Sequence, residues 1–244
     1  MIIYGRNPVR EALRGRRRVA RIWATKNTLR EPWLGDARVP TLPATSDEIE
    51  ARAGTSGHQG VCAEVEPYRY ADSSELLRRP DALIVALDQV QDPQNLGSIC
   101  RTAECAGADG VLIPERRAAE VTPAVCKASA GAVEHLPVAR VRNVADTLAQ
   151  ARGAGYWCYG ASAPSAAGER RPLPYDRPDY SGAGVVLVLG SEGKGLRPRV
   201  AGACDELIAL PQRGRIGSLG VAAAAAALLY EILQDRSASL DSAT

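Results

Sequence analysis

Three separated stretches of this chain combine glycines with polar side chains that could bind and position a ligand. They cover residues 88–101, 189–195 and 208–220. Each stretch joins the end of an expected strand to a loop, and the first and third continue into expected helices. Because open α/β sheets bind ligands outside the carboxyl ends of their strands, the three stretches predict one shared pocket.

The middle stretch places a carboxylate, Glu192, among Gly190, Gly193 and Gly195. Glycines let a backbone approach a ligand closely or adopt a positive φ, although a plain tight turn would also explain them. Their order matches neither a dinucleotide-binding loop nor a phosphate-binding P-loop. The carboxylate would repel a phosphate, so it favours a cationic or amine-bearing ligand.

The other two stretches contribute Asn95, Arg101 and Ser218. Asn95 and Ser218 each stand where a helix is expected to begin, so either could serve only as an N-cap. Arg101 has the reach and permanent charge to hold a phosphate, and the alternative is an ordinary surface arginine. For Lys194 and Arg197 the alternative to a functional role is plain solvation.

The elements that would position these residues alternate between strand and helix from residue 81 onward, which predicts a mostly parallel, helix-covered sheet. A continuous apolar run such as 83–87 is typical of a strand buried on both faces. The further expected strands are 110–114, 136–141, 156–159, 185–189 and 207–210, and the expected helices are one beginning at Asn95, 122–132, 143–151 and 218–234.

A smaller α/β module is expected in residues 1–66. Asn7 and Pro8 suit the N-cap and first helical position of its first helix. The module would also hold strands at 21–25 and 60–65 and a helix at 46–53. Residues 67–80 would link it to a second domain at 81–236, and 237–244 would form a frayed tail.

The charge of the chain is unevenly distributed. Residues 1–40 hold ten basic and three acidic residues, a surplus of seven positive charges, whereas the whole chain has a net charge of only +2. A basic end suggests a polyanionic partner, and the alternative is a solvated arginine-rich face. Aromatic residues make up 5% of the chain and Phe is absent, so RNA would be held by phosphate and shape and not by base stacking.

Several other classes of protein are disfavoured. The six cysteines form no CxxC pair and the two histidines, His58 and His135, lack metal-ligand spacing, so reduced, mostly buried thiols are expected and no metal. No apolar run reaches the roughly 18 residues of a membrane span. The N-terminus has no signal-peptide pattern, and we interpret the chain as cytoplasmic.

Taken together, the three stretches resemble the motifs of the SpoU (TrmH) family of RNA ribose 2′-O-methyltransferases, within the SPOUT class. Residues 88–101 are similar to its first motif, 188–195 to its second, and 210–221 to its third, which leads into an alanine-rich helix. Segments 4–13, 58–61 and 128–135 are similar to the RlmB-like branch, whose accessory domain is of the ribosomal-protein L30e type.

The resemblance implies an α/β fold in which a C-terminal SPOUT trefoil-knot methyltransferase domain (81–236) follows a small L30e-like RNA-binding domain (1–66). It also implies a homodimer through the C-terminal domain and S-adenosylmethionine as cofactor. Knots are rare exceptions to the rules of chain threading, so no physical argument from the sequence would propose one.

The resemblance also implies roles for individual residues. The implied catalytic group is Arg101, Glu192, Asn95 and Ser218. The implied cofactor contacts, largely through the backbone, are at Leu189, Gly190, Gly193, Ile208, Leu210 and Leu219. The basic module offers Arg6, Arg10, Arg16, Arg17, Arg18 and His58 to the RNA.

One departure from the family pattern concerns the third motif. It usually reads Ser-Leu-Asn-Val-Ser, whereas this chain has Gly220 and Ala222 in place of the asparagine and the second serine. An amide can form as many as four hydrogen bonds and glycine offers no side chain, so we expect slower transfer if that asparagine orients a substrate.

The expected substrate is structured RNA, with a guanosine of large-subunit rRNA favoured and tRNA as the alternative. A rival hypothesis is a catalytically weak or inactive knotted RNA-binding protein, which Gly220 alone supports. An oxidoreductase lacks the required glycine order, and base methylation is disfavoured because the motif holding Asn95 and Arg101 is of the ribose type. Arg101 is expected to stabilise the forming alkoxide, with deprotonation by Arg101 as the alternative, since a guanidinium with a pKa above about 12 is a poor base.

Overall fold

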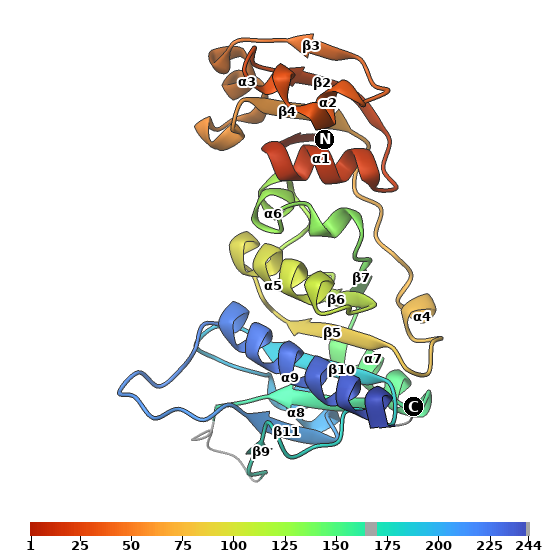
Figure 1. Ribbon diagram of the computed structural model, residues 1–244. Coiled ribbons are helices and arrows are strands. Elements are labelled where there is room, and N and C mark those ends of the chain that lie inside the picture. The colour runs from red at the N-terminus through yellow and green to blue at the C-terminus, as the bar shows by residue number, and fades with distance from the viewer. Residues whose placement is uncertain (164–169, 243–244) are drawn as a thin grey trace.

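The computed structural model describes residues 1–163 and 170–242, which form two α/β units stacked along the long axis of the molecule (Figure 1). In the N-terminal unit four strands form a sheet in the order β1-β4-β2-β3. β2 and β3 run parallel, and β4 runs antiparallel to both of its neighbours. The elements of this unit are β1 (Ile2–Tyr4), α1 (Arg6–Arg14), β2 (Val19–Ala24), α2 (Pro32–Gly35), β3 (Thr41–Pro43), α3 (Ser46–Ala53) and β4 (Val61–Val65).

Local sequence explains how the two longer helices of this unit begin. At α3 the Thr45 hydroxyl accepts a hydrogen bond from the Glu48 amide, and the Glu48 carboxylate accepts one from the Thr45 amide at 2.8 Å, a capping box. α1 begins at Arg6, with Gly5 at its cap position. The prediction of Asn7 as the N-cap is therefore wrong by two residues, because Gly5 takes a φ of 97° that favours glycine.

The second unit contains one parallel sheet. Within residues 83–163 and 170–209, its strands lie in the order β7-β6-β5-β10-β8-β11-β9, and each neighbouring pair is parallel. The strands are β5 (Leu83–Asp88), β6 (Gly110–Pro114), β7 (Val138–Val141), β8 (Trp157–Ala161), β9 (Leu173–Pro174), β10 (Val185–Gly190) and β11 (Glu206–Ala209). The helices are α5 (Pro93–Cys105), α6 (Pro123–Ala128), α7 (Val144–Gly153), α8 (Pro198–Ala203) and α9 (Val221–Ser242), and α4 (Ser73–Leu76) lies in the joining segment.

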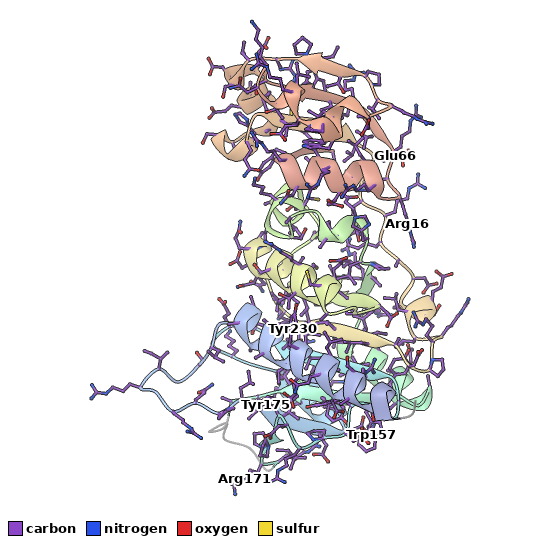
Figure 2. All side chains as sticks on the ribbon, viewed as in Figure 1. Arg16, Glu66, Trp157, Arg171, Tyr175 and Tyr230 are labelled. Atoms are coloured by element: carbon purple, nitrogen blue, oxygen red, sulfur yellow. The ribbon has the colours of Figure 1, made fainter. Side chains whose placement is uncertain are left out.

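The two units meet where the N-terminal unit rests on α6 and the turn at 132–134 (Figure 2). The Arg17 guanidinium forms an ion pair with Glu134, and the two side chains are 7% and 0% exposed. Arg17 also donates to the Glu66 carbonyl at 3.2 Å and lies over the Tyr68 ring. A second contact joins His135 Nε2 to Glu11 Oε2 at 3.1 Å.

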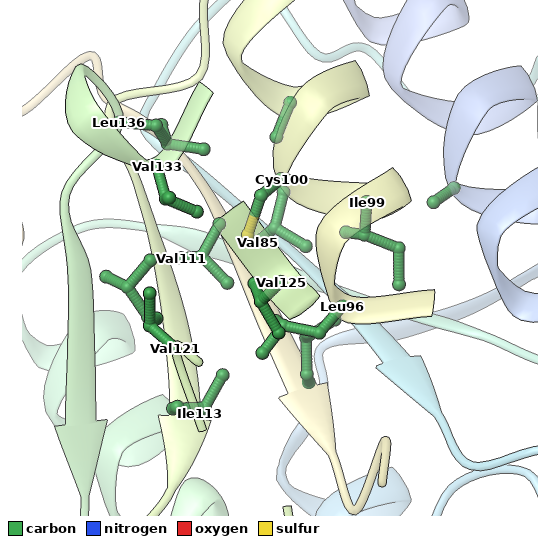
Figure 3. Packing of buried hydrophobic residues seen from close by; sticks show 14 of the residues in the cluster. Val85, Leu96, Ile99, Cys100, Val111, Ile113, Val121, Val125, Val133 and Leu136 are labelled. Atoms are coloured by element: carbon green, nitrogen blue, oxygen red, sulfur yellow. The ribbon is translucent and has the colours of Figure 1, made fainter. Parts of the chain in front are cut away.

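Helices cover both faces of the parallel sheet. Alternate residues of β5 enter two separate cores: Val85 packs on the face of α5, α6 and α9, and Ile84 packs on the face of α7 and α8. Figure 3 shows the first core, where Val85 and Val111 of the sheet lie beside Leu96 and Ile99 of α5. The predicted parallel α/β class is confirmed, and the trefoil knot stays a prediction.

Several element boundaries differ from the sequence-based expectation. The expected helix at 122–132 is interrupted, because Ala130 and Gly131 both take a positive φ. α9 begins at Val221 and continues to Ser242, so Ser218 is not its N-cap and residues 237–242 belong to the helix. The structure also contains three short strands that were not expected, β1, β3 and β9. No helix in the described parts of the chain is long and apolar enough to cross a membrane.

Candidate active site at the carboxyl edge of the parallel sheet

The first and second stretches meet at one edge of the sheet because β5 and β10 are neighbours, with Asp88 opposite Gly190. Asp92 caps α5 by accepting from the Gln94 amide at 2.9 Å, which places Asn95 inside the first turn. The interpretation of Asn95 as an N-cap is therefore wrong. Its amide nitrogen donates to Glu192 Oε1 at 2.7 Å, a bond between two residues 97 positions apart.

The loop that carries Glu192 is a tight hairpin. Ser191 and Gly195 exchange two backbone hydrogen bonds of 3.1 and 2.9 Å, and Gly193 and Gly195 have φ values of 76° and 63°. A Cβ on Gly190 would lie 2.1 Å from the carbonyl carbon of Gly195. Only glycine fits at this position, so the requirement for Gly190 is one of close backbone approach.

An ion pair between a buried carboxylate and a partly exposed arginine links β5 to the end of this hairpin. The Asp88 side chain is fully buried and accepts from the Arg197 backbone amide at 2.8 Å and from Arg197 Nε at 2.7 Å. The Arg197 side chain is 45% exposed, so it is partly solvated, and it also supplies the charged partner that a buried carboxylate needs. Lys194 is exposed.

Arg101 and Ser218 form no hydrogen bond or ion pair with Asn95 or Glu192. Arg101 is exposed on α5 and forms no side-chain hydrogen bond or ion pair within residues 1–163 and 170–242. Ser218 is exposed on the segment between β11 and α9, which projects away from the body in Figure 1. The structure thus joins Asn95 with Glu192 and leaves the other two members of the predicted catalytic group apart.

The third stretch lies further along the same edge, because β8 separates β10 from β11. Leu210 lines a groove of about 460 Å³ together with Tyr175 and the outer side of α9, including Tyr230. No residue of the first or second stretch lines that groove. This groove is therefore separate from the first two stretches, and a single pocket shared by all three stays a prediction.

The predicted cofactor contacts divide into buried and accessible positions. Leu189 and Ile208 are buried strand residues, so only their backbone groups near the sheet edge could face a ligand. Gly193 is exposed, Leu210 is half-buried and Leu219 is 48% exposed. Backbone amides beside an accessible leucine suit an uncharged heterocyclic ring, and Glu192 suits a cationic group nearby.

Two of the predicted RNA contacts are structural. The side chain of Arg17 is buried in its ion pair with Glu134. His58 is 4% exposed, its Nδ1 accepts from the Gly60 amide at 3.0 Å, and its Nε2 lies 3.4 Å from Ser46 Oγ. Burial makes both side chains unavailable to a phosphate, which contradicts their assignment as RNA contacts.

The other predicted RNA contacts remain on the surface. Arg6 pairs with Glu31 at 2.9 Å and Arg10 with Glu11 at 3.1 Å. Arg16 and Arg18 are exposed, and Arg16 lies beside the segment that joins the two units (Figure 2). These four arginines can still present charge to a polyanion.

The cysteines behave as the composition suggested. Cys105 is exposed and the other five are buried and free. Burial raises the pKa of the Cys62 and Cys126 thiols to about 11. The described residues hold no cluster of three or more His, Cys, Asp or Glu side chains that could bind a metal.

Sequence reasoning missed Asp88, Arg197 and Glu134. The role of Asp88 could have been predicted, because it directly follows a continuous apolar strand and a buried carboxylate needs a partner. Glu134 had none, because its partner lies 117 residues away in the other unit.

Comparison with known proteins matches both units. Residues 82–230 match the model of the SpoU rRNA methylase family, and residues 2–71 match the model of the RNA 2′-O ribose methyltransferase substrate-binding domain. The Bacillus subtilis protein YacO, assigned by name to the TrmH family of tRNA/rRNA methyltransferases, is 38% identical over 96% of this chain and 95% of its own length.

Solved structures agree. The SpoU methyltransferase AviRb of Streptomyces viridochromogenes, in complex with the cofactor AdoMet, is 26% identical with a TM-score of 0.78 over 97% of this chain and 90% of its own. An AdoMet-bound rRNA methyltransferase of Sinorhizobium meliloti is 26% identical with a TM-score of 0.78 over 96% of this chain and 86% of its own.

Proposed function

The chain belongs to the SpoU rRNA methylase family, and from that membership and the geometry of its site we propose that it methylates the 2′-hydroxyl of one ribose in structured RNA. It is an RNA methyltransferase with S-adenosylmethionine as the methyl donor, in keeping with the AdoMet-bound relatives. The observation that carries the proposal is the Asn95–Glu192 hydrogen bond, which unites the first and second motifs at the carboxyl edge of the sheet.

The cofactor would lie along the loops that follow β10 and β11. Backbone groups near Gly190 and Leu210 and the accessible Leu219 would hold its adenosine, with Leu189, Gly193 and Ile208 contributing only through the main chain. Bound there, S-adenosylmethionine supplies an electrophilic methyl group on a positively charged sulfur. The carboxylate of Glu192 provides a negative charge at the same edge.

The residues of the chain would activate and position the ribose. Transfer would join the 2′-oxygen to the methyl carbon, the electron pair of the former carbon–sulfur bond would stay on sulfur, and the hydroxyl proton would pass to solvent. Arg101, which has no partner within 1–163 and 170–242, is free to stabilise the negative charge that develops on the 2′-oxygen and the neighbouring phosphate. Asn95 and Glu192 would orient the nucleotide, and Ser218 would join them if its loop folds over the site.

The proposed substrate is large-subunit rRNA, with a guanosine as the modified nucleotide. The segments similar to the RlmB-like branch support this choice, and the match of residues 2–71 to a substrate-binding domain supports RNA in general. Arg6, Arg10, Arg16 and Arg18 remain the proposed contacts of that domain. tRNA is the alternative substrate, since relatives are named for both RNA classes.

We also propose that two copies associate through the C-terminal domain. Tyr230 is 51% exposed on α9, and the groove it lines with Tyr175 is partly apolar (Figure 2). One exposed aromatic side chain on an otherwise small-residue helix suits packing against a second helix. Sedimentation equilibrium of wild type and Tyr230→Glu tests this, with a dimer expected only for the wild type.

A catalytically weak RNA-binding protein is the second candidate. Gly220 in place of asparagine and the exposure of Ser218 on the segment between β11 and α9 favour it. A cofactor that binds the folded state raises its melting temperature, so a thermal shift with S-adenosylmethionine separates a cofactor-binding protein from one that has lost the site.

The decisive experiment measures transfer of labelled methyl from S-adenosylmethionine to rRNA and tRNA isolated from a strain that lacks the gene. Mapping should find one 2′-O-methylated ribose, and Arg101→Ala should lower kcat by about 100-fold or more, the typical loss on removing one charge-stabilising group. Arg78→Ala, an exposed arginine before β5, is the matched control. Absence of transfer to both RNA pools with RNA still bound would replace the proposal with the second candidate.

A further inference from the structure

An arginine-rich strip lies beside the candidate active site. Arg116 and Arg117 follow β6, and Arg142 follows β7, and all three are exposed. Ala86 of β5 pairs with Leu112 of β6, and Pro114 pairs with Val141 of β7. The three arginines therefore extend from the same carboxyl edge that carries Asp88 and Gly190.

The strip is bound to the loop that carries the first motif. The Ala119 amide donates to the Val90 carbonyl at 2.9 Å, so the segment after β6 is held against the segment just before Asn95. The Glu115 amide donates to the Val141 carbonyl at 2.9 Å, which joins the ends of β6 and β7. The distance from α5 to Arg142 is thus fixed by backbone contacts.

The backbone of these adjoining loops is unusual. Gln89 and Arg117 have positive φ values of 64° and 58°, a conformation uncommon for residues other than glycine. Such conformations persist where the surroundings impose them, and they gather at binding and catalytic sites. Here Gln89 lies on the loop that leads to Asn95 and Arg117 lies on the strip, on either side of the hydrogen bond between Val90 and Ala119.

The three arginines of this strip have no acidic partner among the described residues. A neighbouring arginine on β7, Arg140, pairs with Glu120 at 3.4 Å, donates to the Glu115 carbonyl and lies over the Tyr70 ring. Arg116, Arg117 and Arg142 form no ion pair with any described residue. Glu115 and Glu120 are the exposed carboxylates of these loops. With Arg140 included, four guanidinium groups stand beside two carboxylates, so this surface has an excess of positive charge.

We propose that Arg116, Arg117 and Arg142 hold the phosphates of the RNA strand next to the target ribose, which rests on the proposed function. Neighbouring strands lie about 4.8 Å apart, so β5 to β7 spans roughly 10 Å, a distance that a few nucleotides of one strand cover. Guanidinium groups match phosphate oxygens in geometry and charge. Because phosphate contacts fix register and not base identity, the strip positions the ribose over α5, and the N-terminal unit selects the RNA.

The test compares wild type, the triple variant Arg116→Ala/Arg117→Ala/Arg142→Ala, and Arg78→Ala as control. Arg78 is equally exposed but precedes β5, at the opposite edge of the sheet. Binding of total rRNA from a strain lacking the gene is measured by filter retention across a salt series. Each lost phosphate contact should reduce the slope of log affinity against log salt by about 0.7–0.9, so the triple variant should lose about 2.1–2.7 units.

The expected result has three parts. The triple variant binds rRNA at least about 10-fold more weakly at low salt, keeps wild-type affinity for S-adenosylmethionine, and keeps its melting temperature. An unchanged salt slope would overturn the inference, and so would a parallel loss of cofactor affinity or melting temperature, since the arginines would then act on the fold. A wild type that transfers no methyl while the triple variant loses its salt slope would reject the proposed function and leave the strip as an RNA contact.

Discussion

Replacement of Arg17 by alanine should weaken the packing of the N-terminal unit against α6 and lower the free energy of unfolding. The variant leaves the Glu134 carboxylate, which is 0% exposed, without its partner. Removal of one member of a buried ion pair costs about 3–5 kcal/mol of unfolding free energy, because the remaining charge is uncompensated. Loss of the hydrogen bond to the Glu66 carbonyl and of the contact with the Tyr68 ring acts in the same direction.

The adjacent residue provides a matched control. Arg16 is exposed, so Arg16→Ala should change the unfolding free energy by no more than about 0.5 kcal/mol. The double variant Arg17→Met/Glu134→Leu removes both charges and should recover most of the stability, since apolar groups of similar volume often replace a buried pair at little cost.

Urea unfolding followed by tryptophan fluorescence measures the effect on each unit. Trp23 and Trp33 lie in the N-terminal unit and Trp157 lies on β8, so Trp157→Phe confines the signal to the N-terminal unit. A loss of 3–5 kcal/mol corresponds to a fall in Tm of about 6–20 °C for a chain of this size. If Arg17→Ala is as stable as Arg16→Ala, the ion pair does not hold the two units together.

Three further predictions concern the loops and the thiols. Gly220→Asn should raise kcat without loss of stability, because no atom lies within 4 Å of a Cβ placed there. A kcat that does not rise in the methyl-transfer assay would refute the idea that an amide at this position assists transfer. Gly190→Ala should lower affinity for S-adenosylmethionine at least about 10-fold and destabilise the fold by about 1–3 kcal/mol through overpacking. Gly202→Ala, which meets nothing within 4 Å, should do neither, and calorimetric titration with thermal unfolding decides between them. A thiol reagent at pH 8 should label Cys105 alone before unfolding, as mass spectrometry would count. Because folding raises the pKa of Cys62 from 9.0 to about 11, its contribution to stability is present below pH 9.0 and falls as the pH rises toward 11.

The strands of the parallel sheet could be predicted because their signal is local. Residues 83–87 and 185–189 are continuous apolar runs, and such runs suit strands buried on both faces. β3 and β9 carry no comparable signal, since each is two or three residues long, contains proline and lies at a sheet edge. The start of α9 was misplaced for a similar reason: Ser218 has the chemistry of a cap, but the Gly220 carbonyl accepts the first helical hydrogen bond, from Ala224.

The sequence by itself determined the class of fold, the order of its elements and three loops suited to bind a ligand, because apolar periodicity and glycine placement act over short stretches of chain. It also carried the family, since the motifs keep their order and spacing. Only the tertiary structure decided which distant charges meet. Asn95 bonds to Glu192 because β10 pairs with β5, and Arg17 is buried against Glu134 because one unit docks on the other. Such pairings depend on the order of strands in the sheet and on how the units pack, and no local pattern of residues encodes either.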